Sequence, residues 1–369
     1  MSDDHDGTSS GALAKPEPHL LPLKGTTRDL DGVRAAMASW LAPRVGATGK
    51  VSVSSIRTPS TTGVANETLL FDATWDAGAQ ERTEGFAVRV GAERSLYLGA
   101  DLALQARIYE ALEDVEGVPV PHLYGYEADP SFIGDPFFVM QRVEGEVPGD
   151  RPKWWNEGFL VDATPEDRHA MWEDAIRVLA ALHDVDVARF PFLASADGTS
   201  GLLDHLHYWR RALDVVTADQ PHDALERGYE WLLAHLPEPQ PTGFSWGDSR
   251  FPNIMFRDNR VVAIFDFDTA SLAGPGPDLG WWRHFDGHSG LEGIGTADEV
   301  VARWEAESGR AARDLAWYDV FTTLRWGVIA MRGFAHMAAD GMISAETAQR
   351  LGREQGSASE ISAQLDALA

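Results

Sequence analysis

Two aspartates and an asparagine are spaced in a way that suits phosphoryl transfer. Asp248 precedes Asn253 by five residues, and Asp266 follows after a short, largely apolar stretch. Phosphoryl transfer needs a carboxylate that accepts a hydroxyl proton, oxygen ligands for Mg²⁺, and positive groups on the phosphates. Carboxylate and amide oxygens are the ligands that Mg²⁺ prefers. The pattern therefore offers one base and two metal ligands, provided that the fold brings them together.

The residues between Asn253 and Asp266 predict the element that would do this. Ile254–Phe256 and Val261–Phe265 are short strand-like stretches with polar residues between them, which is typical of a β-hairpin. A hairpin at this place would return Asp266 to the side of Asn253. We therefore expect the base and both metal ligands to lie in one site.

The rest of the chain divides into a strand-rich part and a helical part. Alternation and helical spacing predict, in order, strands at 50–56, 69–75 and 86–90, a helix at 102–112, and strands at 123–126 and 137–140. A helix is also expected over 29–41, and helices over 169–183, 203–216 and 223–236 and from residue 281 onward. The order predicts an α+β protein with a small β-rich lobe, a hinge near 140–145 and a larger helical lobe.

Composition excludes several classes of protein. The chain of 369 residues has 31 Lys and Arg against 57 Asp and Glu, a formal net charge of −26, so nucleic acid and anionic membranes are poor partners. There is no cysteine, which rules out a disulfide framework and a thiol nucleophile. No apolar run approaches the ~18 residues of a spanning helix, and the acidic start does not resemble a signal peptide, so a cytoplasmic protein is expected.

The motifs, in their order, resemble those of the aminoglycoside phosphotransferase family, the choline-kinase-like small-molecule kinases that are relatives of protein kinases. The resemblance extends over about residues 50–335 and rests on the segments 87–90, 105–112, 118–121, 138–145, 179–183, 246–256, 264–268 and 278–279. It implies a two-lobed protein-kinase-like fold with a small antiparallel β-sheet N-lobe and a larger, mainly helical C-lobe. We expect the N-lobe at 26–143 and the C-lobe at 144–369, after a flexible tail at 1–25.

The resemblance also assigns roles to particular residues. Asp248 becomes the candidate catalytic base, Asn253 and Asp266 the candidate Mg²⁺ ligands, and Arg250 a supporting catalytic group near the γ-phosphate. The implied nucleotide-binding residues are Asn66, Arg89, Gln105, Met140, Gln141 and Val143. Asn66 lies in a loop that would cover the nucleotide, and the last three lie in the hinge that would contact adenine. The implied cofactors are ATP, with GTP as an alternative, and Mg²⁺.

Three residues depart from the family pattern. Trp246 stands where the family usually has histidine, Arg89 where it has lysine, and Gln105 where it has the glutamate that pairs with that lysine. Arginine keeps the charge but not the geometry of an ammonium group, and glutamine offers a hydrogen bond without an ion pair. These departures leave open a nucleotide-binding pseudokinase of weak or no activity. The run Asp266–Thr269 also resembles, poorly, the first motif of dehalogenase-type phosphatases.

The function implied is an ATP-dependent transfer of a phosphoryl group to a hydroxyl of a small molecule. Family resemblance permits aminoglycosides, macrolides, amino alcohols, sugars, homoserine-like metabolites and hydroxyacyl thioesters as acceptors. Only four lysines occur in the chain, so arginines, Arg89 first and Arg250 second, together with Mg²⁺ would have to hold the phosphates. The acidic excess mildly favours a cationic acceptor over a coenzyme A ester. The sequence carries no sign of its oligomeric state.

Overall fold

The computed structural model describes residues 28–59, 67–78, 80–91, 95–150, 152–199 and 201–369. Its elements follow one another as α1 (Leu30–Leu41), β1 (Ser52–Val53), β2 (Glu67–Ala77), β3 (Gln80–Val90), α2 (Leu102–Leu112), β4 (Leu123–Glu127), β5 (Phe137–Gln141), α3 (Phe159–Asp162), α4 (Pro165–His183), α5 (Gly201–Val216), α6 (Asp223–Ala234), β6 (Ile254–Arg257), β7 (Arg260–Ile264), α7 (Gly276–Phe285), α8 (Ala297–Ser308), α9 (Leu315–Ala339), α10 (Ala345–Glu354) and α11 (Ser357–Leu368). Short 3₁₀ turns lie at Val187–Arg189, Pro191–Leu193 and Phe251–Asn253.

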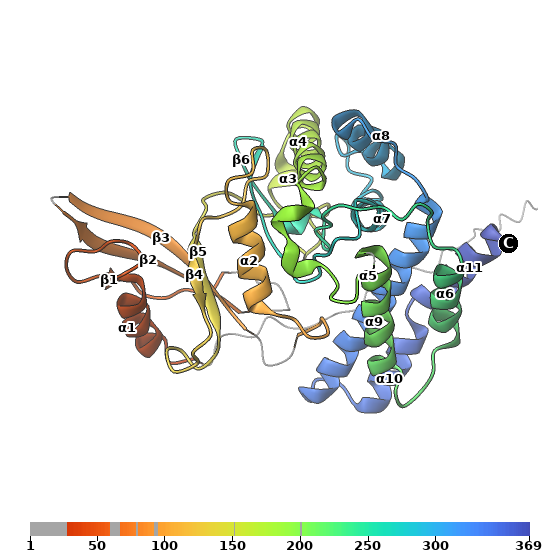
Figure 1. The fold of residues 1–369 in the computed structure, drawn as a ribbon, viewed down its shortest axis with the longest axis horizontal. Coiled ribbons are helices and arrows are strands. Elements are labelled where there is room, and N and C mark those ends of the chain that lie inside the picture. The colour runs from red at the N-terminus through yellow and green to blue at the C-terminus, as the bar shows by residue number, and fades with distance from the viewer. Residues whose placement is uncertain (1–27, 60–66, 79, 92–94, 151, 200) are drawn as a thin grey trace, which may run out of the picture.

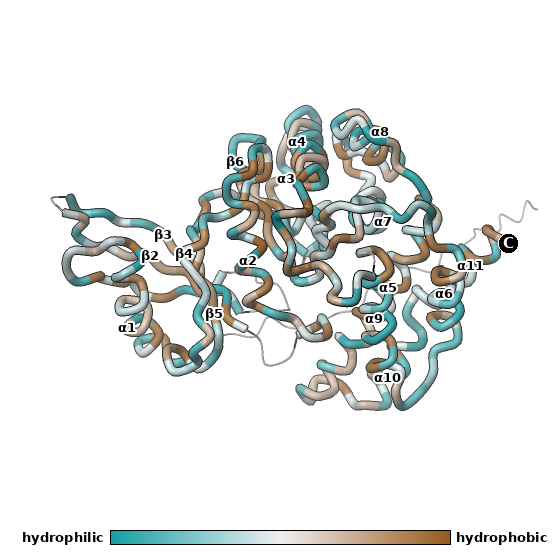
Figure 2. Tube along the Cα trace, viewed as in Figure 1, coloured by the Kyte–Doolittle hydropathy of each residue, from teal (hydrophilic) through white to brown (hydrophobic). Residues whose placement is uncertain are grey.

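The first part of the chain folds into a five-stranded antiparallel sheet in the order β1-β2-β3-β5-β4. The strands appear at the places where alternation predicted them, but β1 covers only Ser52–Val53 of the strand expected over 50–56, and β2 and β3 are longer than expected. Their far end is the reason: Gln80–Thr83 is exposed and polar, so it shows no hydrophobic alternation although its backbone is paired. Figure 2 shows this hydrophilic tip of the hairpin, well away from the rest of the molecule.

The sheet is buried on both faces because successive side chains of a strand point to opposite sides. Phe137 and Val139 pack with Trp40 and Met37 of α1 on one face, whereas Phe138 packs with residues of α2 on the other. Figure 1 shows the sheet between these two helices. The face on the α2 side continues into the core of the helical part of the chain.

The second part is helical, apart from the two-stranded sheet of β6 and β7. The 25-residue α9 lies at its centre and contacts α5, α6, α7, α10 and α11, so most of its residues are buried. This is the two-lobed α+β architecture expected from the sequence. The division between residues 143 and 144 stays a prediction. Among the described residues, no helix is both long enough and apolar enough to span a membrane.

Candidate active site

The β6–β7 hairpin places the second acidic motif beside the first. Asp258 and Asn259 form its two-residue turn with φ values of 51° and 60°, the left-handed backbone of a type I′ turn. Ile264 then pairs with Ile254, and the Phe265 N–H donates to the carbonyl of Asn253 at 2.9 Å. Asp266 follows directly. The predicted hairpin therefore forms and returns Asp266 to the side of Asn253.

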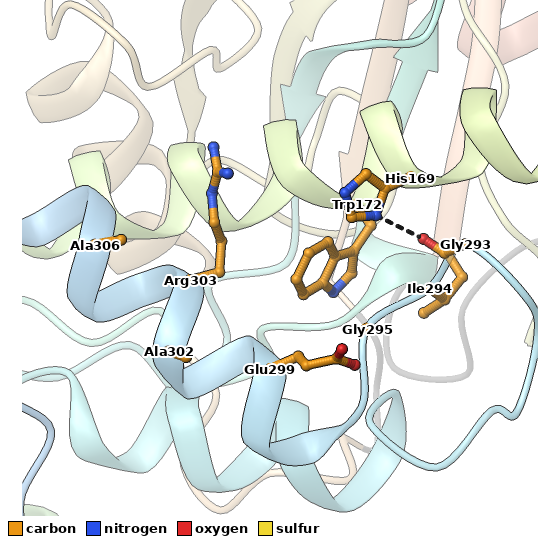
Figure 3. Close-up of a pocket in the computed structure, with 9 residues that line it drawn as sticks. All are labelled: His169, Trp172, Gly293, Ile294, Gly295, Glu299, Ala302, Arg303 and Ala306. Atoms are coloured by element: carbon orange, nitrogen blue, oxygen red, sulfur yellow. Dashed lines mark hydrogen bonds between the residues drawn. The ribbon is translucent and has the colours of Figure 1, made fainter.

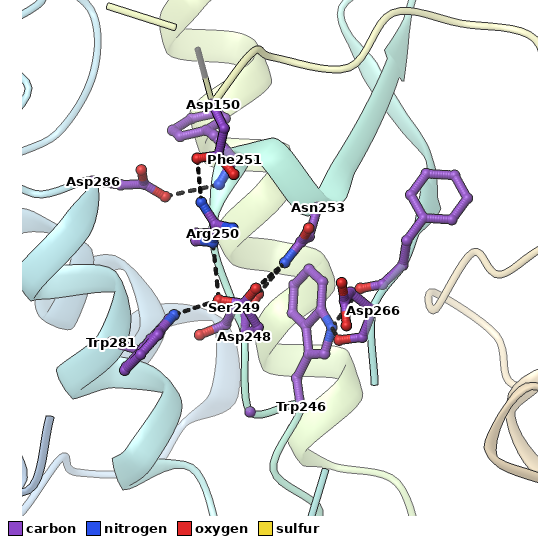
Figure 4. A network of polar contacts seen from close by, with 12 residues as sticks. Asp150, Trp246, Asp248, Ser249, Arg250, Phe251, Asn253, Asp266, Trp281 and Asp286 are labelled. Carbon is purple, nitrogen blue, oxygen red and sulfur yellow. Dashed lines mark hydrogen bonds and ion pairs between the residues drawn. The ribbon is translucent and has the colours of Figure 1, made fainter. Parts of the chain in front are cut away.

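Asp248 lies at the centre of a group of hydrogen-bond donors (Figure 4). Its Oδ1 accepts hydrogen bonds from the Trp281 indole at 2.6 Å and from Arg250 Nε at 2.9 Å. Its Oδ2 accepts one from Asn253 Nδ2 at 2.7 Å, and the same amide donates to the Asp248 carbonyl at 2.8 Å. Because Oδ1 already accepts two hydrogen bonds, Oδ2 is the carboxylate oxygen that can accept one more.

Trp281 is not among the candidate site residues from the sequence, and the structure gives it a direct hydrogen bond to Asp248. We expect Trp281→Phe to slow phosphoryl transfer about tenfold, since a hydrogen bond to a charged group contributes about 1.5–3 kcal/mol. The KM for ATP should stay unchanged, because the indole touches the carboxylate and not the hinge. Steady-state kinetics test this.

Trp282→Phe is the matched control for that variant. Trp282 is buried like its neighbour, but its indole nitrogen has no hydrogen-bond partner in the described part of the chain. Both substitutions remove the same volume, and only one removes a bond to Asp248. Equal losses of kcat in the two variants would contradict a positioning role for Trp281.

Asp278 on α7 holds the backbone of the loop that carries Asp248. Its fully buried carboxylate accepts hydrogen bonds from the Trp246 N–H at 2.6 Å, the Gly247 N–H at 2.7 Å, Ser245 Oγ at 3.1 Å and His183 Nε2 at 2.9 Å. An indole N–H can only donate, so the bond from Trp304 to His183 Nδ1 leaves the ring hydrogen of His183 on Nε2. Asp278 therefore fixes the geometry of the loop that carries Asp248.

Asp278→Asn is expected to lower the free energy of unfolding by about 3 kcal/mol, because an amide opposes some of these buried donors with its own N–H groups. The rate of transfer should fall as well, since the Asp248 loop loses its anchor. Chemical denaturation and activity measured on the same preparation test both effects. Unfolding at the wild-type denaturant concentration would contradict the anchoring role.

Trp246 explains one departure from the family pattern. Its indole donates to the carbonyls of Phe265 and Asp266 at 2.8 and 3.0 Å, so it connects the Asp248 loop to the Asp266 loop. Figure 4 shows the ring standing against Asp266.

Gly247 beside Trp246 has a φ of 96°, and a Cβ there would lie 2.4 Å from the Thr269 hydroxyl, so this position requires glycine.

Arg325 is a site residue that sequence reasoning missed. This buried α9 guanidinium donates to the carbonyls of Gly247 and Pro277 and stacks over Trp281 with its Cζ 4.2 Å from the ring centre. Burial lowers the pKa of Arg325 to about 10. An isolated arginine in an apolar helix was the only signal available, and such a residue does not reveal its partners.

Arg89, Gln105 and two aspartates form the second part of the site. Arg89 Nη2 lies 3.4 Å from Asp266 Oδ2 and 3.8 Å from Asp268 Oδ2, and Gln105 Nε2 donates to Asp268. Burial lowers the pKa of Arg89, but the two carboxylates outweigh it and raise that pKa above its ordinary value. Burial and the charge of Asp266 raise the pKa of Asp268. Asp268 thus lies between Gln105 and Arg89, where the sequence suggested a direct contact of those two.

Asp266 offers an oxygen suited to a cation. It has a left-handed backbone with a φ of 65°, and its Oδ1 is buried without a hydrogen-bond partner in the described residues. Because Asn253 turns its amide nitrogen toward Asp248, its oxygen is the atom left for a metal. The described residues contain no cluster of three or more His, Cys, Asp or Glu placed to bind a metal. Two oxygen ligands still suit Mg²⁺, which commonly takes one or two protein ligands plus phosphates and water.

Arg250 is held between two acidic groups. It bonds to Asp248 through Nε and to Asp150 through Nη1, and these carboxylates raise its pKa well above the ordinary value despite burial. The next residue, Phe251, donates its N–H to Asp286 at 2.8 Å, and burial raises the pKa of Asp286 to about 7. The Arg250 guanidinium thus contacts the candidate base, Asp248.

The predicted hinge residues lie at the end of β5. Met140 is buried in the sheet, and Gln141 donates its N–H to the His122 carbonyl at 2.8 Å. Val143 lies just beyond the strand, and its N–H makes no backbone hydrogen bond within the described chain. Val143 is thus the hinge position best able to offer its backbone to a ligand. The remaining predicted residue, Asn66, lies outside the described residues.

A separate groove lies away from these residues, between α4 and α8 (Figure 3). Its volume is about 500 Å³, and its lining includes His169, Trp172, Gly295 and Arg303. None of the predicted site residues lines this groove. The chemistry-bearing residues gather instead where the Asp248 loop, the hairpin and the sheet meet.

Comparison with curated proteins gives distant relatives. Acyl-CoA dehydrogenase family member 10 of Mus musculus is 26% identical over 273 residues, which is 69% of this chain and 24% of the relative. Acyl-CoA dehydrogenase family member 11 of Gallus gallus is 30% identical over 173 residues, which is 46% of this chain and 21% of the relative. The chain therefore spans about a quarter of the length of these relatives or less.

Solved structures share the fold. A candidate aminoglycoside phosphotransferase from Ralstonia eutropha is 24% identical with a TM-score of 0.66, and the match covers 89% of this chain and 96% of that one. The macrolide 2′-phosphotransferase of Brachybacterium faecium is 20% identical with a TM-score of 0.54, over 86% and 98%. Aminoglycoside phosphotransferase APH(4)-Ia, solved with AMP-PNP and hygromycin B, is 16% identical with a TM-score of 0.53, over 89% and 98%.

The sequence itself settles the family. The profile of the phosphotransferase enzyme family matches residues 73–315, more than half of the 369 residues, and contains the loop of Asp248, the β6–β7 hairpin and Asp278. The family expected from the motifs is thereby confirmed. The chain belongs to the phosphotransferase enzyme family.

Proposed function

We propose that the protein transfers the γ-phosphoryl group of ATP to a hydroxyl of a small molecule. One observation carries the proposal: Asp248 and Asn253 are hydrogen-bonded to each other, and the hairpin returns Asp266 beside them. A base and two oxygen ligands for a cation thus meet in one place. Phosphoryl transfer depends on such positioning and on electrostatic stabilisation, and little on covalent help from the protein.

Asp248 would receive the proton of the acceptor. The hydroxyl oxygen attacks the γ-phosphorus, its proton passes to Asp248 Oδ2, the bond from the γ-phosphorus to the bridging oxygen breaks, and ADP leaves. Oδ1 is occupied by Trp281 and Arg250, so these two donors fix the carboxylate with Oδ2 facing the acceptor. Arg250 would then act mainly by orienting the base, in place of the contact with the γ-phosphate that the family resemblance suggested.

Asn253 Oδ1 and Asp266 Oδ1 would hold Mg²⁺. When bound, Mg²⁺ would offset the negative charge of the nucleotide phosphates. Arg89 is the described cation nearest to Asp266 and would bind phosphate oxygens from the β3 side. The backbone of Val143 would contact the base of ATP or GTP at the hinge.

The acceptor remains to be identified by experiment among two favoured classes. The acidic balance of the chain favours a cationic alcohol, such as an aminoglycoside or amino alcohol. The curated relatives are named as acyl-CoA dehydrogenase family members, so a hydroxyacyl thioester, which the family resemblance permits, is the second class to test. We rank the cationic alcohol first only for its charge, since a coenzyme A ester would bring phosphates into an acidic protein.

The test is to mix the protein with Mg·ATP or Mg·GTP and a panel of alcohols from both classes, and to follow ADP or GDP formation. Turnover with one class and not with the other identifies the acceptor. Nucleotide binding without turnover across the panel would favour the pseudokinase, which the intact set of Asp248, Asn253 and Asp266 makes the weaker hypothesis. Phosphate release from a phosphomonoester would favour the phosphatase. We retain the cytoplasm as the proposed compartment.

A further inference from the structure

The residues just before α2, Ser95–Leu98, contact the helical lobe. Arg332 of α9 donates Nε to the Leu96 carbonyl at 2.7 Å and Nη2 to the Ser95 carbonyl at 2.8 Å. In Figure 1 the chain just before α2 extends toward α9. Ser95–Leu98 is therefore one of the segments that connect the N-terminal part of the chain to the helices, in addition to Arg89 and the chain that follows β5.

Tyr97 is the residue of this segment that enters the helical lobe. It is 8% exposed and belongs to the buried cluster that contains Trp209 and Trp281. Its N–H donates to Ser95 Oγ at 3.1 Å, which stabilises the local turn, and Leu98 packs partly buried against the same cluster. An aromatic side chain from the N-terminal lobe thus packs into a core that is built mainly from α5, α6, α7 and α9, together with Ile361 of α11 and Ala273.

The buried cluster that contains Tyr97 reaches the loop of Asp248 through Trp281. Trp281, in the same cluster, donates directly to Asp248. Burial raises the pKa of Tyr97 well above its ordinary value, and among the neighbouring charges Asp248 raises it most, followed by Asp266. The phenol therefore keeps its proton at neutral pH and adds no charge to a site already rich in carboxylates.

We propose that Tyr97 forms the wall of the acceptor pocket contributed by the N-terminal lobe, limits which alcohols reach Asp248, and excludes water from the γ-phosphate. Arg332 is a positioning residue that holds this wall against α9. The inference rests on the proposed phosphotransferase function. It adds a specificity determinant from outside the catalytic motifs, at a position that the motifs themselves do not mark.

If Tyr97 forms this wall, its removal should change the rates of transfer to the two competing acceptors, the alcohol and water, in opposite directions. We expect Tyr97→Ala to lower kcat/KM for the alcohol about tenfold and to raise ADP release in the absence of alcohol severalfold, with KM for ATP nearly unchanged. Tyr97→Phe keeps the ring and should retain most of the exclusion of water. Arg332→Ala should change both reactions in the same directions as Tyr97→Ala, and Arg332→Lys should restore part of the effect.

The probes are Mg·ATP alone and Mg·ATP with the alcohol that shows the best turnover in the acceptor panel. Tyr124→Ala is the control, because Tyr124 is a partly buried tyrosine of β4 whose hydroxyl donates to Glu84 in the same lobe. Opposite changes of hydrolysis and transfer in the Tyr97 and Arg332 variants, absent from Tyr124→Ala, would support the wall.

A merely structural role of Tyr97 would lower both reactions together, and that result would overturn the inference. So would wild-type rates of both reactions in a folded Tyr97→Ala variant. Failure of the proposed function gives a different result, since the wild-type protein would then form no ADP with any alcohol. In that case the rate of ATP hydrolysis without alcohol tests whether Tyr97 excludes water. A higher rate in Tyr97→Ala than in the wild type supports the inference, and an unchanged rate rejects it.

Discussion

Asp248→Ala is expected to lower the rate of phosphoryl transfer by about 10²–10⁴, the range found for loss of a general base. Alanine removes the proton acceptor without placing a new N–H opposite the Asn253 amide. That amide keeps its other bond, to the backbone carbonyl of residue 248, at 2.8 Å. Mg·ATP should therefore bind with nearly wild-type affinity, because the metal ligands and the hinge are intact.

Single-turnover kinetics measure the chemical step, and titration with a non-hydrolysable ATP analogue measures binding. Asp319→Ala is the control, since Asp319 is an acidic residue of the same lobe that pairs with Arg283 at 3.1 Å, away from Asp248. Loss of analogue binding in a folded Asp248→Ala variant would show that the carboxylate supports the nucleotide site. Transfer at the rate of the control would show that another group accepts the proton.

The sequence predicts the local parts of this protein well. The helix at Leu102–Leu112 has the predicted bounds, and the hairpin forms between the predicted apolar stretches. Both follow from periodicity and turn chemistry within a few residues, which the sequence displays directly. The extensions of β2 and β3 are the exception, because backbone pairing and the hydrogen bond between the Thr74 and Thr83 hydroxyls hold the polar end of that hairpin without hydrophobic alternation.

Contacts between distant residues could not be predicted from such patterns. Arg325 lies far along the chain from Gly247, and nothing in its neighbourhood marks the carbonyl that it holds. Gln105 was expected against Arg89, whereas Asp268 lies between them. A motif shows which residue types a reaction needs. The pairing of those types depends on packing across elements, and period and spacing do not encode it.

The net charge of −26 has a local counterpart in the site. The two arginines that the sequence predicts to bind phosphates form ion pairs with carboxylates, Arg89 with Asp266 and Arg250 with Asp248. In the proposed function, binding of a nucleotide would exchange these partners: Arg89 would turn from the carboxylate to a phosphate, and a cation would take its place at Asp266. If this exchange occurs, the Asp266 carboxylate should affect ATP binding in opposite directions with and without Mg²⁺, and the two effects can be measured separately.

Asp266→Asn isolates the metal-binding charge. Asparagine tolerates the left-handed backbone of residue 266, so the loop should keep its shape. Loss of the carboxylate should weaken Mg²⁺-dependent binding of ATP at least about tenfold, since even indirect supports of a metal site contribute 10–100-fold. Without Mg²⁺ the sign should reverse: the variant should bind ATP as well as the wild type or better, because a negative charge near the phosphates is gone and Arg89 has lost its competitor.

Mg²⁺ titrations of ATP-analogue affinity measure both effects. Asp258→Asn is the matched control, because residue 258 in the hairpin turn also has a left-handed backbone, with a φ of 51°, and receives the same substitution. The control should keep the wild-type rise of affinity with Mg²⁺, whereas the Asp266→Asn curve should be nearly flat. An undiminished Mg²⁺ effect in Asp266→Asn would show that the cation is held elsewhere, and with it the exchange of partners at Arg89 would have to be given up.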